Sequence, residues 1–139
     1  MIVDQKLLNQ LFKQAAENPR KRMNYDMRTS SEDGSQHMMN AMLPGTEVPI
    51  HRHPISNENV ILITGKLYEI LYEEVEEEDG KSVLHETNRL YLNPSEGRYG
   101  CEVPKGVWHT VEVIEPSVTY EGKNGKYGED GSEVYCRDD

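Results

Sequence analysis

The sequence predicts an all-β barrel that carries one α-helix at its N-terminus. Three observations predict it: short apolar runs recur after residue 35, pairs of turn residues separate these runs, and no second helical pattern lies between them. Several short strands at such spacing are typical of a β-sandwich or a β-barrel. The 139 residues suffice for one domain with a single core.

The first residues of the chain predict the helix. Asp4 is a suitable N-cap, because its carboxylate can accept a hydrogen bond from the first turn, and Asn18-Pro19 ends the helical pattern. Between these positions, apolar residues recur at three- and four-residue spacing: Leu7, Leu8, Leu11, Phe12, Ala15 and Ala16. We expect this amphipathic helix to pack on a larger body.

The strand pattern divides the chain into three parts. The apolar runs cover residues 38–43, 60–63, 67–72, 90–92, 101–103, 110–114 and 117–120, and pairs such as Pro44-Gly45 and Asp79-Gly80 separate them. We therefore expect a barrel over residues 36–121. Residues 1–35 would form the helix and a basic loop that pack on this barrel, and residues 122–139 an acidic, Gly-rich surface tail.

The charge of the chain excludes one class of partner. The net charge is -10, so the chain lacks the basic surface that binding to nucleic acid requires. Acidic residues gather in residues 73–79, which we interpret as a solvated strand end and hairpin tip. A calcium loop is the alternative, but the run lacks the alternating oxygen ligands of such a loop.

Two features predict a cytoplasmic protein without a membrane partner. Asp4, Lys6 and Lys13 interrupt the place where a secretory signal would have its apolar run, and no segment approaches the ~18 apolar residues of a membrane span. The two cysteines, Cys101 and Cys136, are then expected as reduced thiols. Cys101 lies in a predicted strand, where a buried structural cysteine is commoner than a nucleophile.

A pair of histidines and a glutamate carry the strongest functional signal. Alternate residues of a strand point to the same side, so His51 and His53 can direct two imidazoles at one point. Glu58 follows after a turn, and His109 enters another predicted strand behind the turn residues Pro104 and Gly106. Two histidines alone often bind nothing, but several imidazoles with one carboxylate suit a first-row transition metal.

These residues resemble the two sequence motifs of the cupin superfamily. Gly45, His51, His53, Glu58 and Gly65 match the first motif at every spacing, and Pro104, Gly106 and His109 match the centre of the second. Arg98 and Val113 depart from the second motif, where the family has Gly and Asn. The resemblance implies a double-stranded β-helix, or jelly-roll barrel, in which His51, His53, Glu58 and His109 bind a metal.

A closer resemblance covers most of the chain. The predicted helix, Pro19-Arg-x-Arg22-x-Asn24, Asn40-Ala-Met-x-Pro-Gly-Thr, Pro-x-Gly-x-Trp-His109 and Tyr120-Glu121-x-Lys123-x-Gly125-x-Tyr127 are similar to the WbuC family of cupin-fold metalloproteins. This resemblance implies a link to bacterial surface-polysaccharide genes and brings no assigned reaction. Members usually carry a Lys between His-Pro and Glu, whereas this chain has Ser56-Asn57 there.

Three further residues are candidates for contacts with substrate. Arg22 and Asn24 precede the barrel in a loop that could fold over its mouth, where Arg22 could bind a carboxylate or phosphate or simply pair with a surface acid. Asn40 alternates with Met38 and Met42, so it is a polar group on an apolar strand face and needs a partner. A structural hydrogen bond would explain Asn40 equally well.

Two functions fit these residues. One is a metal-dependent isomerase, lyase or oxygenase acting on a small polar molecule, sugar-derived or carboxylate and anionic if Arg22 binds it; beyond the metal ligands, no catalytic residue is assigned. The other is a binding or sensing module without turnover. One divalent transition metal is expected, with iron, manganese, zinc, nickel and copper all open, and a homodimer is expected because cupins often pair through barrel strands.

Overall fold

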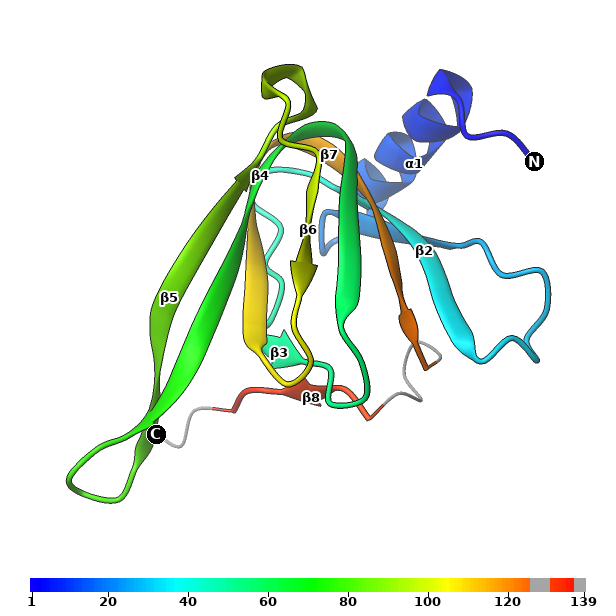
Figure 1. Cartoon of the computed structure of the whole chain (residues 1–139). Helices are drawn as coiled ribbons and strands as arrows, with labels where there is room; N and C mark the ends of the chain where they lie inside the picture. Colours follow the sequence, from blue (N-terminus) through cyan, green and yellow to red (C-terminus); the bar gives the residue numbers. More distant parts are fainter. Residues whose placement is uncertain (126–130, 137–139) are drawn as a thin grey trace.

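A computed structural model describes residues 1–125 and 131–136, and it confirms a mostly β fold with one N-terminal helix (Figure 1). The helix α1 spans Gln5–Glu17, with Asp4 as its N-cap accepting a hydrogen bond from the amide of Leu7 at 2.9 Å. The strands are β1 (Arg22–Asp26), β2 (Ser35–Met42), β3 (His51–Arg52), β4 (Glu58–Glu76), β5 (Ser82–Leu92), β6 (Gly100–Val103), β7 (Trp108–Asn124) and β8 (Glu133–Val134).

The strands form one curled antiparallel sheet in which β4 and β7 are the long central members. Strand β7 pairs with β2, β3 and β4, while β4 also pairs with β5 and β6. Figure 1 shows the sheet wrapping around an interior, with β3 and β8 crossing one end of it. No helix among the described residues has the length and apolar character to cross a bilayer.

Both long strands join two of the apolar runs that the sequence separates. Strand β4 continues through Thr64-Gly65, where the register with β7 shifts and the strand bends. Gly65 has φ +106°, and a Cβ atom there would collide with Ser117 on β7, so only glycine permits this close approach. The turn signal at Thr64-Gly65 therefore marks a bend within a strand and not the end of one.

Two apolar clusters lie on opposite sides of the sheet. The cluster inside the barrel consists of Met42, Val60, Leu62, Leu67, Leu92, Val103 and Val113. The second cluster fixes α1 against the outer side of β2 and β7, and consists of Leu8, Leu11, Ala15, Met39, Ala41 and Val118. The alternation along β2 thus sends Met42 into the barrel and Met39 and Ala41 toward the helix.

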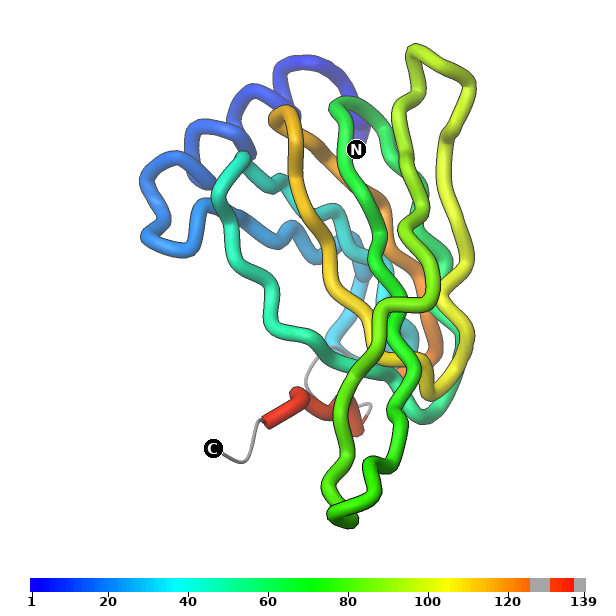
Figure 2. Tube along the Cα trace, turned by 90° about the vertical axis from the view of Figure 1, so that its left-hand side faces the viewer, coloured from blue at the N-terminus to red at the C-terminus, as the bar shows by residue number. Residues whose placement is uncertain are grey.

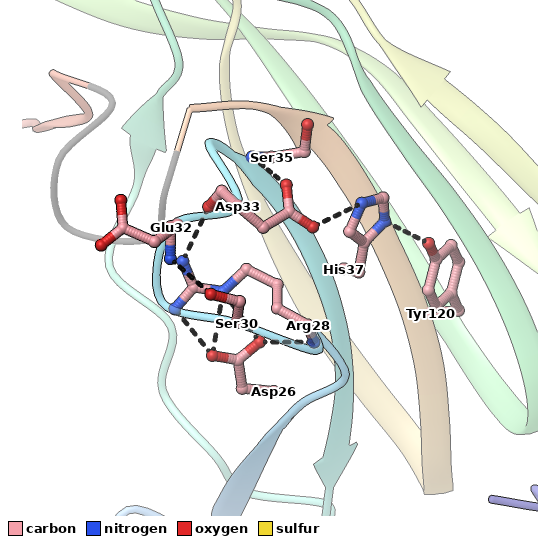
Figure 3. A network of polar contacts seen from close by, with 8 residues as sticks. All are labelled: Asp26, Arg28, Ser30, Glu32, Asp33, Ser35, His37 and Tyr120. Carbon is pink, nitrogen blue, oxygen red and sulfur yellow. Dashed lines mark hydrogen bonds and ion pairs between the residues drawn. The ribbon is translucent and has the colours of Figure 1, made fainter.

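The predicted basic loop contains a strand that the sequence did not reveal. Strand β1 pairs with β2 along its whole length, and Arg28 behind it forms an ion pair with Asp26 at 2.8 Å (Figure 3). In the same network His37 lies 3.0 Å from the hydroxyl of Tyr120. These contacts give Arg28 and His37 structural roles in tying the 27–34 loop to β2 and β7.

The described part of the tail continues the barrel. Strand β7 extends to Asn124, and residues 131–136 return so that β8 pairs with β3, with His51 opposite Val134 (Figure 2). Arg52 reinforces this pairing through an ion pair with Glu133 at 2.9 Å. The remainder of the predicted tail, including Tyr127, lies outside the described residues.

Candidate metal centre

The three motif histidines meet at the end of the barrel that β3 and β8 cross. His51 on β3 is paired in register with His109 on β7, and His53 follows directly after β3. Each offers a ring nitrogen, and these nitrogens lie within 4.8 Å of one another. The i, i+2 spacing and the long β7 strand therefore bring together residues that are far apart in the sequence.

The second nitrogen of two of these rings is already engaged, which orients the rings. His51 Nδ1 lies 2.8 Å from the carbonyl of Pro49, and His109 Nδ1 lies 3.0 Å from the carbonyl of Val107. Because a carbonyl only accepts, both rings carry their proton on Nδ1 and present an unprotonated Nε2, the form that binds metals. His109 Nε2 is buried and has no hydrogen-bond partner among the described residues, as expected for a nitrogen that awaits a metal ion.

Glu58 brings a carboxylate to the same point from the start of β4. Its oxygens lie 3.1 Å from His53 Nε2 and 3.8 Å from His109 Nε2. Burial raises the pKa of Glu58, but the hydrogen bond with His53 and the neighbouring imidazoles outweigh it and hold the pKa below its usual value. The carboxylate therefore stays ionised beside the histidines.

The electrostatics of the imidazoles also suit a cation. Burial lowers the pKa of His51, and burial with the proximity of His51 lowers the pKa of His109 to about 4. The His109 ring is then neutral at physiological pH. Neutral imidazoles and one carboxylate form a donor set that fits a first-row divalent metal.

The cluster opens into a cavity of about 390 Å³ inside the barrel mouth. His51, Glu58 and His109 line it at one side, and Met38, Met42 and Val111 provide apolar wall. Ser132 and Val134 reach it from the 131–136 segment, and Ser132 Oγ lies 2.7 Å from His53 Nδ1. The sequence did not predict that residues 131–136 contribute to the site, because their composition is that of a surface tail.

The structure places Arg22, Asn24 and Asn40 on the wall of this cavity. Arg22 donates to the carbonyl of Glu47 at 2.8 Å and to Thr46 Oγ1 at 3.4 Å, so its guanidinium also anchors the loop before β3. Asn24 on β1 is exposed and lies opposite Asn40 on β2. Asn40 Oδ1 is buried without a hydrogen-bond partner in the described residues, while its side chain bonds to Glu121.

Two glutamates of the cavity wall were missed from the sequence. Glu69 on β4 and Glu121 on β7 both line the cavity, and Glu69 is only 6% exposed. Strand parity could have indicated Glu69, since it stands two residues after the buried Leu67. Glu121 stands two residues after the buried Thr119 in the same way.

Other residues near the motifs have structural partners. Asn57 donates to Glu102 at 3.0 Å and accepts from the Lys105 amide at 2.7 Å, and Ser56 Oγ accepts from the Asn124 amide at 3.0 Å. Cys101 and Cys136 are free thiols, and burial raises the pKa of Cys101 to about 12, which makes it a poor nucleophile.

Solved structures share the fold of this chain. An oxalate oxidase in complex with the substrate analogue glycolate has a TM-score of 0.56 at 14% identity, covering 84% of this chain and 56% of its own. TT1209 from Thermus thermophilus has a TM-score of 0.55 at 21% identity over 89% and 96% of the two chains. CapF from Staphylococcus aureus, described as a capsular polysaccharide assembling protein, has a TM-score of 0.57 at 16% identity. The match covers 84% of this chain and 32% of CapF.

These likenesses concern the fold alone, and the chain spans just over half the length of the oxalate oxidases it matches. No curated protein matches its sequence. The chain therefore shares a barrel fold with these proteins, and its three clustered histidines lie close enough to one another to hold a metal ion. The chain belongs to the family described as domain of unknown function DUF6016, whose sequence profile matches residues 3–84, more than half of the chain.

Proposed function

We propose that the protein binds one divalent transition metal through His51, His53, Glu58 and His109, and that it is a metal-dependent enzyme for a small polar molecule. One observation carries the proposal: three imidazole nitrogens within 4.8 Å of one another, with the Glu58 carboxylate beside them, at the edge of a cavity. Iron, manganese, zinc, nickel and copper all accept this donor set.

The chemistry of the centre follows from its donors. Three neutral imidazoles and one carboxylate leave a divalent ion with net positive charge, which would polarise a carbonyl or hydroxyl group or activate water or dioxygen. Isomerase, lyase and oxygenase reactions all fit. The carbonyls of Pro49 and Val107 hold the His51 and His109 rings in place, so the donors are preorganised.

The proposed substrate is a sugar-derived or carboxylate molecule, and it is anionic if the arginines of the cavity wall bind it. The cavity of about 390 Å³ has the size of a small-ligand site, and Arg20 and Arg22 lie on its wall. Membership of the WbuC group of cupins, with a role in surface-polysaccharide synthesis, agrees with the description of CapF. This part of the proposal rests on residue resemblance and on fold analogy.

Elemental analysis tests the metal centre. Protein purified without chelator is expected to carry about one transition metal per chain, and the His51→Ala/His53→Ala double variant to carry almost none. His85→Ala is the matched control, because His85 is exposed on β5 and only approaches Glu77 at 4.0 Å. Equal metal content in the double variant and the wild type would refute the assignment of ligands.

The alternative is a module that binds a small molecule without converting it. Ser56 and Asn57, which stand where WbuC members usually carry a Lys, are used in bonds to Asn124, Glu102 and Lys105, and neither lines the cavity. A ligand recovered unchanged after prolonged incubation with the metal-loaded protein would support this alternative. Any product detected by mass spectrometry would favour the enzyme.

The protein is proposed to act as a homodimer that pairs through barrel strands. Ile61 on β4 and the neighbouring Tyr99 are apolar side chains that stay 47% and 61% exposed in the single chain. Pairing with a second copy of the chain through this surface would bury both side chains away from water. Light scattering of the purified protein should give a dimer mass, and Ile61→Glu should lower that mass toward one chain.

A further inference from the structure

Glu69 is a buried acid whose role is not explained by contacts with other described residues. Its side chain is 6% exposed, and within residues 1–125 and 131–136 no hydrogen bond or ion pair joins it to another residue. Strand parity turns it inward beside Leu67, where it lines the cavity of the metal centre. Its carboxyl therefore faces the cavity and is available to a ligand there.

Two polar side chains share this inner wall with Glu69. Glu121 on β7 also lines the cavity, with Oε1 3.3 Å from Thr119 Oγ1. Asn40 on β2 bonds to Glu121 and keeps a buried Oδ1 without a hydrogen-bond partner among the described residues. Three strands therefore direct two carboxyls and one amide into the same small space.

The chemistry of the two carboxyls and the amide decides what they recognise. Carboxyl oxygens accept hydrogen bonds and an amide both donates and accepts them, so the three side chains match hydroxyl groups, which also do both. A ligand carboxylate only accepts hydrogen bonds and would face the Glu69 and Glu121 carboxyls on this wall.

We propose that Glu69, Glu121 and Asn40 form a hydroxyl-binding subsite on the inner wall of the barrel, which binds the hydroxyl groups of a polyhydroxylated ligand such as a monosaccharide. The inference deepens the proposed function and rests on it, because the subsite belongs to the same cavity. It separates the two substrate classes left open above: sugar hydroxyls reach the inner wall, and any anionic group stays at the Arg20 and Arg22 side of the mouth.

Three sugars of equal size but different charge test the subsite. D-glucose, D-glucuronate and D-glucosamine are titrated into the metal-loaded full chain, and dissociation constants are measured by ligand-detected NMR. We expect D-glucose to bind at least as tightly as D-glucuronate, whose carboxylate would face the Glu69 and Glu121 carboxyls, and we expect the binding of both D-glucose and D-glucosamine to depend on Glu69. Glu69→Leu should weaken its binding about tenfold, the worth of one hydrogen bond in this setting. Glu69→Gln should retain most of the affinity, since an amide also donates and accepts.

Two further variants keep the test decisive. Glu121→Leu is the second wall variant in case Glu69→Leu does not fold, and it should weaken D-glucose binding to a similar extent. Glu78→Gln makes the same chemical change at an exposed residue after β4 and should leave all three affinities unchanged. Thermal unfolding of each variant confirms that it is folded.

The outcomes separate this inference from the proposed function. Unchanged D-glucose affinity in Glu69→Leu, tighter binding of D-glucuronate that does not depend on Glu69, or no binding of any of the three sugars would overturn the subsite. Metal content is measured on the same samples. A wild type that takes up no metal refutes the proposed function, whereas metal uptake with sugar binding indifferent to Glu69 refutes the subsite alone.

Discussion

His51 and His109 lie directly opposite each other on β3 and β7, with ring centroids 4.2 Å apart. The two rings come from strands joined by a single residue pair, and both are held by a backbone carbonyl two residues earlier in the chain. Two neutral imidazoles at this distance do not stabilise each other strongly. Their arrangement, held by strand pairing and by these carbonyls, suits the metal ion of the proposed function.

Removal of His109 should abolish the stabilisation that metal gives. A metal that binds only the folded state stabilises it by about 4 kcal/mol at a thousand times its Kd. In thermal unfolding with and without added metal, wild type and His85→Ala should show a clear rise in Tm, and His109→Ala should show almost none. An equal rise in His109→Ala would contradict its role as a ligand.

Arg22→Ala should loosen the loop that carries His51. The substitution removes the hydrogen bonds to Thr46 and to the carbonyl of Glu47, at a cost of about 1–2 kcal/mol in the free energy of unfolding. Metal content should stay at the wild-type level, because Arg22 is no ligand. Urea denaturation measures the stability, and a titration with sulfate asks whether anion binding weakens; equal sulfate binding would leave Arg22 with its structural role alone.

Glu69→Leu should make the metal-free protein more stable. The leucine removes a buried carboxyl without a partner in the described chain and extends the apolar wall next to Leu67. We expect a gain of about 1–2 kcal/mol in urea denaturation, the typical penalty of such a group. A loss of stability would show that Glu69 supports the fold rather than a ligand.

The stability of the metal-free protein should depend on pH through Glu121. Folding raises the pKa of this carboxyl from 4.5 to about 8, so the folded state prefers the protonated form. Stability from this group is complete below pH 4.5 and is lost as pH rises toward 8, with a slope of at most about 1.4 kcal/mol per pH unit.

Glu121→Gln isolates this contribution. Glu69, whose pKa burial also raises, acts in the same sense as Glu121, and His109 acts in the opposite sense, since its lowered pKa costs stability as pH falls from 6.5 toward 4. The wild-type curve contains all of these effects. The difference in unfolding free energy between Glu121→Gln and wild type should therefore grow as pH rises from 4.5 to 8. A difference that does not vary with pH would show that Glu121 ionises normally in the barrel.

Gly65→Ala should destabilise the barrel more than Gly80→Ala. Both glycines have positive φ, so each substitution carries the cost of an unusual backbone, about 1 kcal/mol. Only at Gly65 does the new Cβ meet another strand, while at Gly80 nothing lies within 4 Å. We expect a loss of about 3 kcal/mol or more at Gly65; equal losses would mean that Ser117 yields without cost.

The N-terminal helix could be predicted from the sequence, because its limits depend on residues that are neighbours in the chain. The cap at Asp4 and the break at Asn18-Pro19 each depend on neighbours in the chain, and the structure confirms the helix within these limits. The spacing of His51 and His53 predicted that they share one side of a strand, and the resemblance to the cupin motifs implied that His109 joins them; the structure brings all three together. The role of these residues as ligands stays a prediction.

Features that depend on distant partners were not predictable. Strand β1 is polar and short, and only its pairing with β2 makes it a strand. Glu69 and Glu121 are a different case: they were missed because an acid in an alternating strand usually faces water, although each stands two residues after a buried residue of its strand. Their place on the cavity wall agrees with the direction that strand parity indicates.

The bond between His53 and Ser132 makes the order of synthesis matter. His51, His53 and His109 all emerge before β8, the strand that covers the free edge of β3 and brings Ser132 to His53. During synthesis the three imidazoles are therefore exposed before residues 131–136, which orient the His53 ring, have been made. Under the proposed function, a metal ion bound at that stage would meet a looser site than the finished barrel offers.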